Sequence, residues 1–193
     1  MAKYPNNGQM NQWFYSAGTL KSLFAAIGYD FEISQLSPGA LEGRFRLGGS
    51  RLVPLMSITT NQVLVFEGGR RAGWLPFCIS TSSETPLVRG NEVPQMSMHG
   101  FCSDLQDAFF QLPAGCHLQI ALVSRERMEQ LALAANEHHA LDLISSTNSA
   151  RLPAERFDRL SKILQPSQSD PFQGELIEAE LLDLLSQRDV QRL

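Results

Sequence analysis

Two alternating stretches separated by a tight turn decide the fold of this chain: Phe31-Glu32-Ile33-Ser34-Gln35-Leu36, then Ser37-Pro38-Gly39, then Leu41-Glu42-Gly43-Arg44-Phe45-Arg46-Leu47. In both stretches apolar and polar residues alternate, which is the period of a β-strand with one buried face. The Pro-Gly pair between them favours a type II turn, because proline presets the first central residue and glycine accepts a positive φ at the second. This part of the chain is therefore expected to be β-structure.

Runs of the same kind continue to Ser124, with no helical pattern between them. The further predicted strands are Val53–Ile58, Val63–Phe66, Leu75–Ile79, Gln95–Met98, Asp107–Gln111 and His117–Val123. Glycine-containing turns separate these runs. About eight strands at close spacing indicate an antiparallel sandwich or barrel, so residues 30–124 are expected to form the core domain.

The segment before the core, residues 1–29, predicts an arm and a helix. Residues 1–10 are polar and are expected to be a loose arm. Apolar residues then recur with the spacing of one helix face, at Leu20, Leu23, Phe24 and Ile27. Ser16 or Thr19 is a suitable N-cap, and Gly28 stands where a left-handed C-terminal cap is expected.

Residues 125–193 return to a helical period. Ser124 is a suitable N-cap for a helix over Arg125–Ala135, and Pro153 opens a second helix. The second helix turns Phe157, Leu160 and Leu164 inward. A third helix within Glu175–Leu193 carries an apolar seam of Ile177, Leu181, Leu184 and Leu185. A helix this short is marginal alone in water, so the seam either docks on the core domain or pairs two protomers.

Charge and hydropathy exclude several classes of protein. Basic and acidic side chains balance over residues 1–124, so the net charge of −4 comes from residues 125–193. Neither part has the basic stripe that nucleic-acid binding requires. No apolar run approaches the roughly 20 residues of a membrane helix, and the N-terminus lacks a secretory signal pattern. We expect a cytoplasmic protein that does not itself bind DNA or membranes.

Three cysteines, Cys78, Cys102 and Cys116, make an odd set without Cys-x-x-Cys spacing. This pattern argues against a disulfide framework and against a thiolate zinc site. Buried reduced thiols that act as small apolar side chains are the simpler interpretation.

Several motifs in order resemble the sensor domain of AraC-family regulators of the ethanolamine-utilisation type. Gln35, Leu36, Gly39, Leu41, Gly43, Arg44 and Phe45 stand in the places of that family's opening motif. Thr60-Asn61-Gln62 with Gly68, Trp74–Phe77, Leu112–Gly115 and the acidic, leucine-rich Glu178–Leu185 follow in the family's order. The resemblance covers nearly the whole chain.

The resemblance implies a mainly β, α+β fold: a cupin-like antiparallel β-barrel or sandwich with a short N-terminal helix and a C-terminal helical segment. It also implies a regulatory domain for ligand sensing and dimerisation in transcription regulation, with residues 125–193 as the dimerisation linker. DNA would be bound only by a helix-turn-helix domain beyond Leu193. The chain is then either an excised domain or a stand-alone relative of such domains.

Metal-dependent cupin enzymes are an alternative. Their barrels hold the metal with a His-x-His and Glu motif and a later histidine after Pro-x-Gly-x-x. Here Pro113-Ala114-Gly115-Cys116-His117 places the histidine one residue early, which turns it to the other face of a strand. His99 has no histidine two residues away, and neighbouring helical residues such as His138 and His139 point about 100° apart. We expect no metal, no cofactor and no catalytic residue.

Two other motifs were weighed against simpler interpretations. The glycine pairs Gly48-Gly49 and Gly68-Gly69 lack the following Lys-Ser/Thr of a phosphate loop and are typical of turns. Arg70-Arg71 beside Gly73-Trp74 could form an anion or cation–π site, or could be a solvated hairpin tip.

Soft apolar side chains offer material for the interior of the core domain. Phe77, Met96, Met98 and Phe101 are the predicted walls of a small-molecule pocket, because alternation places them on one face. The alternative is a filled core, since small barrels are often packed without a cavity.

The sequence thus predicts a sensor and dimerisation domain that binds a small effector or a partner and works as a homodimer. A stand-alone scaffold or protein-interaction module is the first alternative, and a small metal-dependent cupin enzyme is the second. The enzyme alternative predicts metal bound at unit stoichiometry. Elemental analysis of the purified protein tests it, and a metal-free protein would eliminate its usual form.

Overall fold

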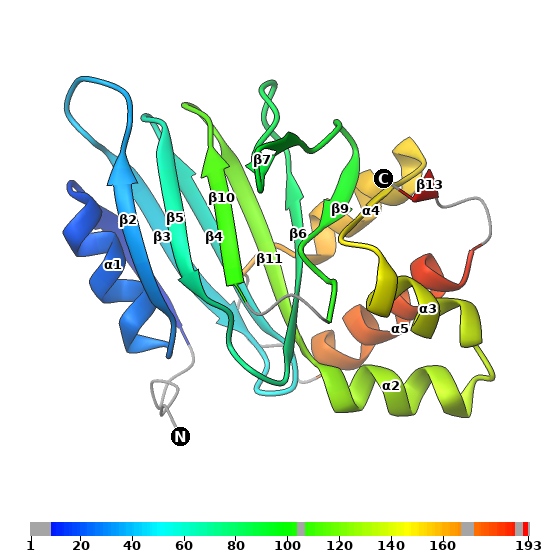
Figure 1. The fold of residues 1–193 in the computed structure, drawn as a ribbon. Helices are drawn as coiled ribbons and strands as arrows, with labels where there is room; N and C mark the ends of the chain where they lie inside the picture. Colours follow the sequence, from blue (N-terminus) through cyan, green and yellow to red (C-terminus); the bar gives the residue numbers. More distant parts are fainter. Residues whose placement is uncertain (1–8, 104–106, 167–171, 188–190, 193) are drawn as a thin grey trace.

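The computed structural model describes residues 9–103, 107–166, 172–187 and 191–192. Two antiparallel sheets face each other, with one helix beside them at the N-terminal end and four helices grouped on the far side of the larger sheet (Figure 1). The helices are α1 (Ala17–Ala26), α2 (Arg125–Ala134), α3 (His138–Ser146), α4 (Ala154–Ile163) and α5 (Gln173–Ser186).

The two sheets account for every strand in the described ranges. In spatial order, the larger sheet contains β1 (Met10–Phe14), β3 (Gly43–Gly49), β4 (Pro54–Thr60), β11 (His117–Ser124), β6 (Trp74–Ser80), β9 (Ser97–His99), β12 (Ser149–Arg151) and β13 (Gln191–Arg192). The smaller sheet contains β2 (Asp30–Gln35), β5 (Leu64–Gly69), β10 (Asp107–Leu112), β7 (Leu87–Val88) and β8 (Asn91–Glu92).

The predicted mainly β, α+β fold is confirmed, and each predicted strand overlaps an observed one, although Gln95 and Met96 form a turn before β9. The two sheets stay open, because the described pairing leaves β1 and β13 as the edges of one sheet and β2 and β8 as the edges of the other. The molecule is therefore a sandwich with barrel-like curvature and not a closed barrel. The alternating stretches at residues 31–47 become β2 and β3, which lie in different sheets.

Two separate hydrophobic cores result from this arrangement. The first lies between the sheets and centres on Phe24, whose ring lies 5.2 Å from Phe31, 5.4 Å from Phe45 and 5.8 Å from Phe66, all edge-on. Such contacts add about 0.5–1.5 kcal/mol each to the stabilisation from buried area. The second core lies between the outer face of the larger sheet and helices α2 to α5.

The central strands β6 and β11 contribute side chains to both cores. On β6, Phe77 and Ile79 face the helices while Cys78 faces the smaller sheet. On β11, Ala121 and Val123 face the helices while Ile120 faces the smaller sheet. A strand buried on both faces is nearly continuously apolar, as residues 117–123 are.

The caps predicted for the helices on either side of the core are confirmed. Ser16 Oγ accepts a hydrogen bond from Thr19 N at 3.1 Å, and Gly28 follows the helix with φ of 88°. Ser124 Oγ accepts from Arg127 N at 3.4 Å at the start of α2. Both caps satisfy backbone donors that the first turn of a helix leaves unpaired.

Six of the described elements were not predicted: β1, α3, β12 and the two-residue strands β7, β8 and β13. Strand β1 lies within the expected arm and helix of residues 1–29, where only Phe14 is fully buried and the polar residues Asn11 and Gln12 gave no strand period. Helix α3 buries Ala140, Leu143 and Ile144. Strand β12 then returns to the larger sheet beside β9, so residues 125–193 add to the sheet as well as forming helices.

Ion pairs hold α5 against its neighbours. Arg127 on α2 pairs with Glu178 at 3.2 Å, and Arg159 on α4 pairs with Glu180 at 2.7 Å. Arg156 contacts both Glu180 at 3.2 Å and Asp183 at 2.8 Å. Glu178 and Glu180 are almost completely buried. A buried carboxylate that loses such a partner becomes strongly destabilising, so these pairs set the position of α5.

The predicted dimer residues Ile177, Leu181, Leu184 and Leu185 are each 0% exposed within this chain and belong to the core between the larger sheet and the helices. Of the two outcomes open for this seam, the structure shows intramolecular docking. The seam is already covered, because the outer face of the larger sheet is an apolar surface that needs a cover of its own.

We expect Leu181→Ala to lower the free energy of unfolding by about 2–5 kcal/mol, because it leaves a cavity in a packed core. Urea unfolding measures the loss. Leu176→Ala is the matched control on the same helix, since Leu176 is 51% exposed, and it should change stability by less than about 0.5 kcal/mol. Equal losses in the two variants would show that α5 is not docked as described.

Candidate functional site

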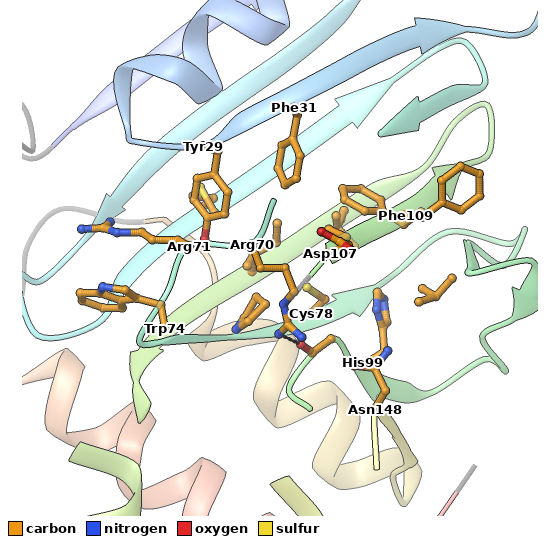
Figure 2. A pocket seen from close by; sticks show the side chains of 18 of the residues that line it. Tyr29, Phe31, Arg70, Arg71, Trp74, Cys78, His99, Asp107, Phe109 and Asn148 are labelled. Carbon is orange, nitrogen blue, oxygen red and sulfur yellow. Dashed lines mark hydrogen bonds between the residues drawn. The ribbon is translucent and has the colours of Figure 1, made fainter. Parts of the chain in front are cut away.

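A cavity lies between the two sheets (Figure 2). It is close to the connection of residues 70–73, which joins β5 of the smaller sheet to β6 of the larger sheet. Its volume is about 80 Å³. Helix α1, strands β2 and β10 of the smaller sheet, and strands β4, β6, β9 and β11 of the larger sheet all contribute to the wall. The wall consists mainly of apolar atoms, so the cavity suits a small organic molecule.

Aromatic rings form the wall on the side of the smaller sheet. Tyr29 and Phe31 stack with centroids 5.2 Å apart, and Phe31 meets Phe110 edge-on at 6.0 Å. Phe24 closes the end nearest α1. Opposite them, Ile120 of the larger sheet provides an aliphatic surface. The two sides together present flat apolar surfaces to whatever occupies the cavity.

Arginine side chains gather at the rim. The guanidinium of Arg70 donates to the backbone carbonyls of Cys102, at 2.6 Å, and Gly100. Burial is the main cause that lowers the Arg70 pKa. The guanidinium of Arg71 lies 4.7 Å from the centroid of the Trp74 ring. The cation–π contact considered from the sequence is therefore present, and it lies beside the cavity mouth.

A third arginine reaches the rim from a strained turn. Arg89 and Gly90 join β7 to β8 with φ values of 53° and 81°, the conformation of a two-residue type I′ hairpin. Asparagine or aspartate usually precedes the glycine in such turns, because a positive φ is unfavourable for other side chains. The turn holds Arg89 next to the cavity, with Asp107 as a carboxylate in the same wall.

His99 is a polar residue in the deep part of the wall. It is 4% exposed, and burial lowers its pKa to about 4, so the imidazole is neutral at physiological pH. Its Nε2 has no hydrogen-bond partner among the described residues. A buried polar atom without a partner costs about 1–3 kcal/mol. Figure 2 shows the ring projecting from β9 toward the space beside Cys78 and Asp107.

Cys78 lies beside His99, since the two are backbone partners on β6 and β9. Burial raises the pKa of the Cys78 thiol to about 12, although the nearby Arg70 lowers it. Burial also raises the pKa of Cys116. A thiol with a raised pKa is a poor nucleophile at neutral pH, so these cysteines fit the predicted role of buried apolar groups.

A chain of hydrogen bonds leads from the rim to the helical layer. Gly100 and Cys102, whose carbonyls hold Arg70, bind Asn148 through their amides: Gly100 N donates to Asn148 O at 2.8 Å, and Cys102 N donates to Asn148 Oδ1 at 3.3 Å. Ser103 N donates to Ile144 O of α3 at 2.7 Å. Gly100 has φ of 93°, and a Cβ there would lie 2.9 Å from Pro76 O, so this segment has little freedom to shift.

The four residues predicted as pocket walls do not line the cavity. Phe77, Met98 and Phe101 are fully buried in the other core, against the helices, with the rings of Phe77 and Phe101 stacked 5.5 Å apart. Met96 packs beside that core. Alternation correctly grouped these side chains on one face, but it assigned them to the wrong one. Both faces of β6 are buried, so apolar character does not distinguish the inner face from the outer.

The residues that do line the cavity left only weak signals in the sequence. His99 follows Met98 and so had to lie on the opposite face, which is the cavity face. The Arg70-Arg71 and Trp74 motif, a possible anion or cation–π site from the sequence, lies at the rim of the cavity. The aromatic wall combines residues from α1, β2 and β10, and no local pattern connects these distant segments.

The described parts of the chain hold neither a cluster of metal ligands nor a helix that could cross a membrane. No three His, Cys, Asp or Glu side chains there are placed together as metal ligands. His117 is half-buried, and its Nδ1 lies 3.1 Å from Thr81 Oγ1. None of the described helices has the length and hydropathy needed to cross a bilayer.

Comparison with known proteins gives a similarity of fold. No family model matches the chain, and no curated protein matches it. Among solved structures, the chain is similar to the crystal structure of the AraC-like transcriptional activator CuxR, with a TM-score of 0.56 and 9% sequence identity. The similarity covers 95% of this chain and 72% of that one. At this identity it shows a shared fold, and it agrees with the AraC-like resemblance at that coarse level.

The buried His99 predicts an acid-sensitive stability. Its pKa is about 4 in the folded protein and about 6.5 when unfolded. Between these values the unfolded chain binds more protons, so stability falls as the pH drops from 6.5 to 4, by roughly 3 kcal/mol from this group. We expect His99→Leu to remove that part of the dependence, measured by urea unfolding at pH 7 and pH 4.5.

His138→Leu is the control for this comparison, because His138 is exposed. It should keep the pH dependence of the parent protein. If His99→Leu and His138→Leu have the same acid sensitivity, His99 is not buried as a neutral group.

Proposed function

We propose that this chain is the small-molecule-sensing regulatory domain of an AraC-like transcriptional regulator and that it has no enzymatic activity. One observation carries the proposal: the inter-sheet cavity shares strands β6, β9 and β11 with the core that holds the helices. An occupant of the cavity contacts Cys78, His99 and Ile120, and the residues next to each of them in sequence pack against the helical layer. The fold similarity to CuxR supports a regulatory role.

The mechanism we propose is a shift in the packing of the helices on the larger sheet. Arg70 and Asn148 both line the cavity, and the hydrogen bonds through Gly100 and Cys102 connect them to the start of β12 and the end of α3. A ligand that binds one arrangement of this segment better than another changes their populations by its difference in affinity. The readout is then the position of the helices that precede any DNA-binding unit.

The partner predictions remain proposals. We propose that DNA contact would need a helix-turn-helix domain outside the 193 residues of this sequence, since this sequence shows no basic stripe and its net charge is −4. Homodimer formation is still expected from the resemblance. It must use another surface than Ile177, Leu181, Leu184 and Leu185, because these are covered within the chain.

The function is tested by filling the cavity. Ala108 lies on β10 in the cavity wall, and Ala108→Phe should occupy part of the space. A library of metabolite-sized molecules is screened by thermal shift against the parent protein. We expect molecules that raise the melting temperature of the parent, because a ligand that binds only the folded state stabilises it by about 2.7 kcal/mol at 100 times its dissociation constant. The same molecules should have no effect on Ala108→Phe.

Ala114→Phe is the matched control, since Ala114 lies in an exposed turn outside the cavity wall. It should respond to ligands as the parent protein does. Ligands that stabilise Ala108→Phe as well as the parent would bind elsewhere, and that result would favour the scaffold alternative over sensing in the cavity.

A further inference from the structure

The chemistry of the cavity wall restricts what can occupy it. Nearly all of the wall is carbon, from the rings of Tyr29, Phe31 and Phe110 on one side and from Ile120 on the other. Each buried hydroxyl or amide of a ligand that finds no partner there weakens binding, because its hydrogen bonds to water are lost and not replaced. Molecules with many polar groups are therefore disfavoured by the wall.

His99 offers one hydrogen bond inside this apolar space. Its side chain is 4% exposed, and its Nε2 is without a partner in the part of the chain that is described. The neutral imidazole carries a proton on only one of its nitrogens, so Nε2 either donates or accepts. A hydroxyl group can complement both cases, because it has one donor and two acceptor sites.

Two of the three arginines at the rim, Arg70 and Arg71, are engaged by the protein itself. Arg70 directs two nitrogen atoms of its guanidinium at the carbonyls of Gly100 and Cys102, and Arg71 lies over the ring of Trp74. Figure 2 shows the Arg70 side chain in the cavity wall, with a dashed hydrogen bond at its guanidinium. The guanidinium groups of Arg70 and Arg71 thus serve to hold the wall and the mouth, while Arg89 lines the same cavity together with the carboxylate of Asp107.

We propose that the cavity takes a small, uncharged, mainly apolar molecule of about one ring that carries a single hydroxyl group, held by a hydrogen bond to the imidazole of His99. This inference rests on the proposed function and names the chemical class of its effector. It places phenols and hydrophobic alcohols inside the class. Sugars, nucleotides and carboxylates lie outside it, because they bring several polar groups or a charge into a wall that does not complement them.

Three matched probes test this class on the full chain: 4-ethylphenol, ethylbenzene and 4-ethylbenzoate, with binding measured by ligand-observed NMR titration at pH 7. They share one ring and one ethyl group and differ at one position. We expect 4-ethylphenol to bind about tenfold more tightly than ethylbenzene, since a hydrogen bond to a buried group contributes about this factor. We expect 4-ethylbenzoate to bind more weakly than either, because its charge must be desolvated.

His99→Leu identifies the hydrogen bond. In this variant 4-ethylphenol should lose its tenfold advantage, so that it binds no more tightly than ethylbenzene. The affinity for ethylbenzene should be retained. His138→Leu, the same change at an exposed position, should keep the order of the parent. If circular dichroism shows that His99→Leu does not fold, the order of the three affinities on the parent protein tests the proposed ligand class.

Each other outcome overturns the proposed class. Tightest binding of 4-ethylbenzoate would assign the rim arginines to an anion, and an advantage of 4-ethylphenol that survives in His99→Leu would remove His99 from the site. Binding of none of the probes also ends the proposal. In each of these cases the sensing function is tested separately. That test asks whether Ala108→Phe abolishes the response to the molecules found by thermal shift.

Discussion

The rest of the structure depends on the burial of β6 and β11 on both faces. Their inner faces pack against the smaller sheet, and their outer faces against the helices, so Phe77 and Cys78 are neighbours in sequence and members of different cores. Backbone hydrogen bonds in the middle of the larger sheet are thereby removed from water on both sides. Neither the smaller sheet nor the helical layer can be displaced without exposing one apolar face of the same strands.

Polar groups set how the helical layer sits on that sheet. Gln119 on β11 is 0% exposed, and its side-chain amide exchanges two hydrogen bonds with Ser161 of α4, at 3.0 and 3.1 Å. Apolar packing is non-directional, so it tolerates many arrangements of a helix on a sheet. A buried amide that must find both its partners tolerates few. Together with the arginine pairs of Glu178 and Glu180 on α5, this contact gives the layer one register.

The cavity lies where the inner core is incomplete. Phe24 fills the space between the sheets near α1, whereas the cavity wall contains the polar side chains His99 and Asp107 beside the aromatic rings. A well-packed interior has few voids larger than a water molecule. The cavity and the unpartnered Nε2 of His99 therefore both lower the stability of the sandwich, and they leave space for a ligand.

Local sequence patterns predicted much of the fold. Side-chain period located strands β2 to β6 and β9 to β11, and Ser16 and Ser124 located the helix starts, because capping and side-chain period depend on near neighbours in sequence. Strand β1 was missed, since an edge strand with polar side chains has no apolar period. The candidate site was largely missed, because Phe31, His99 and Phe110 come from three segments that meet only in the folded chain.

The sequence by itself determined most of the long strands and helices, and that Phe77 shares a face with Ile79. It could not determine which face of β6 lines a cavity, because apolar side chains on both faces are equivalent to any pattern based on hydrophobicity. For the same reason it left open whether the leucines of α5 dock within the chain or between chains. Only the tertiary structure decided these questions, since burial depends on which surfaces meet and not on the order of residues.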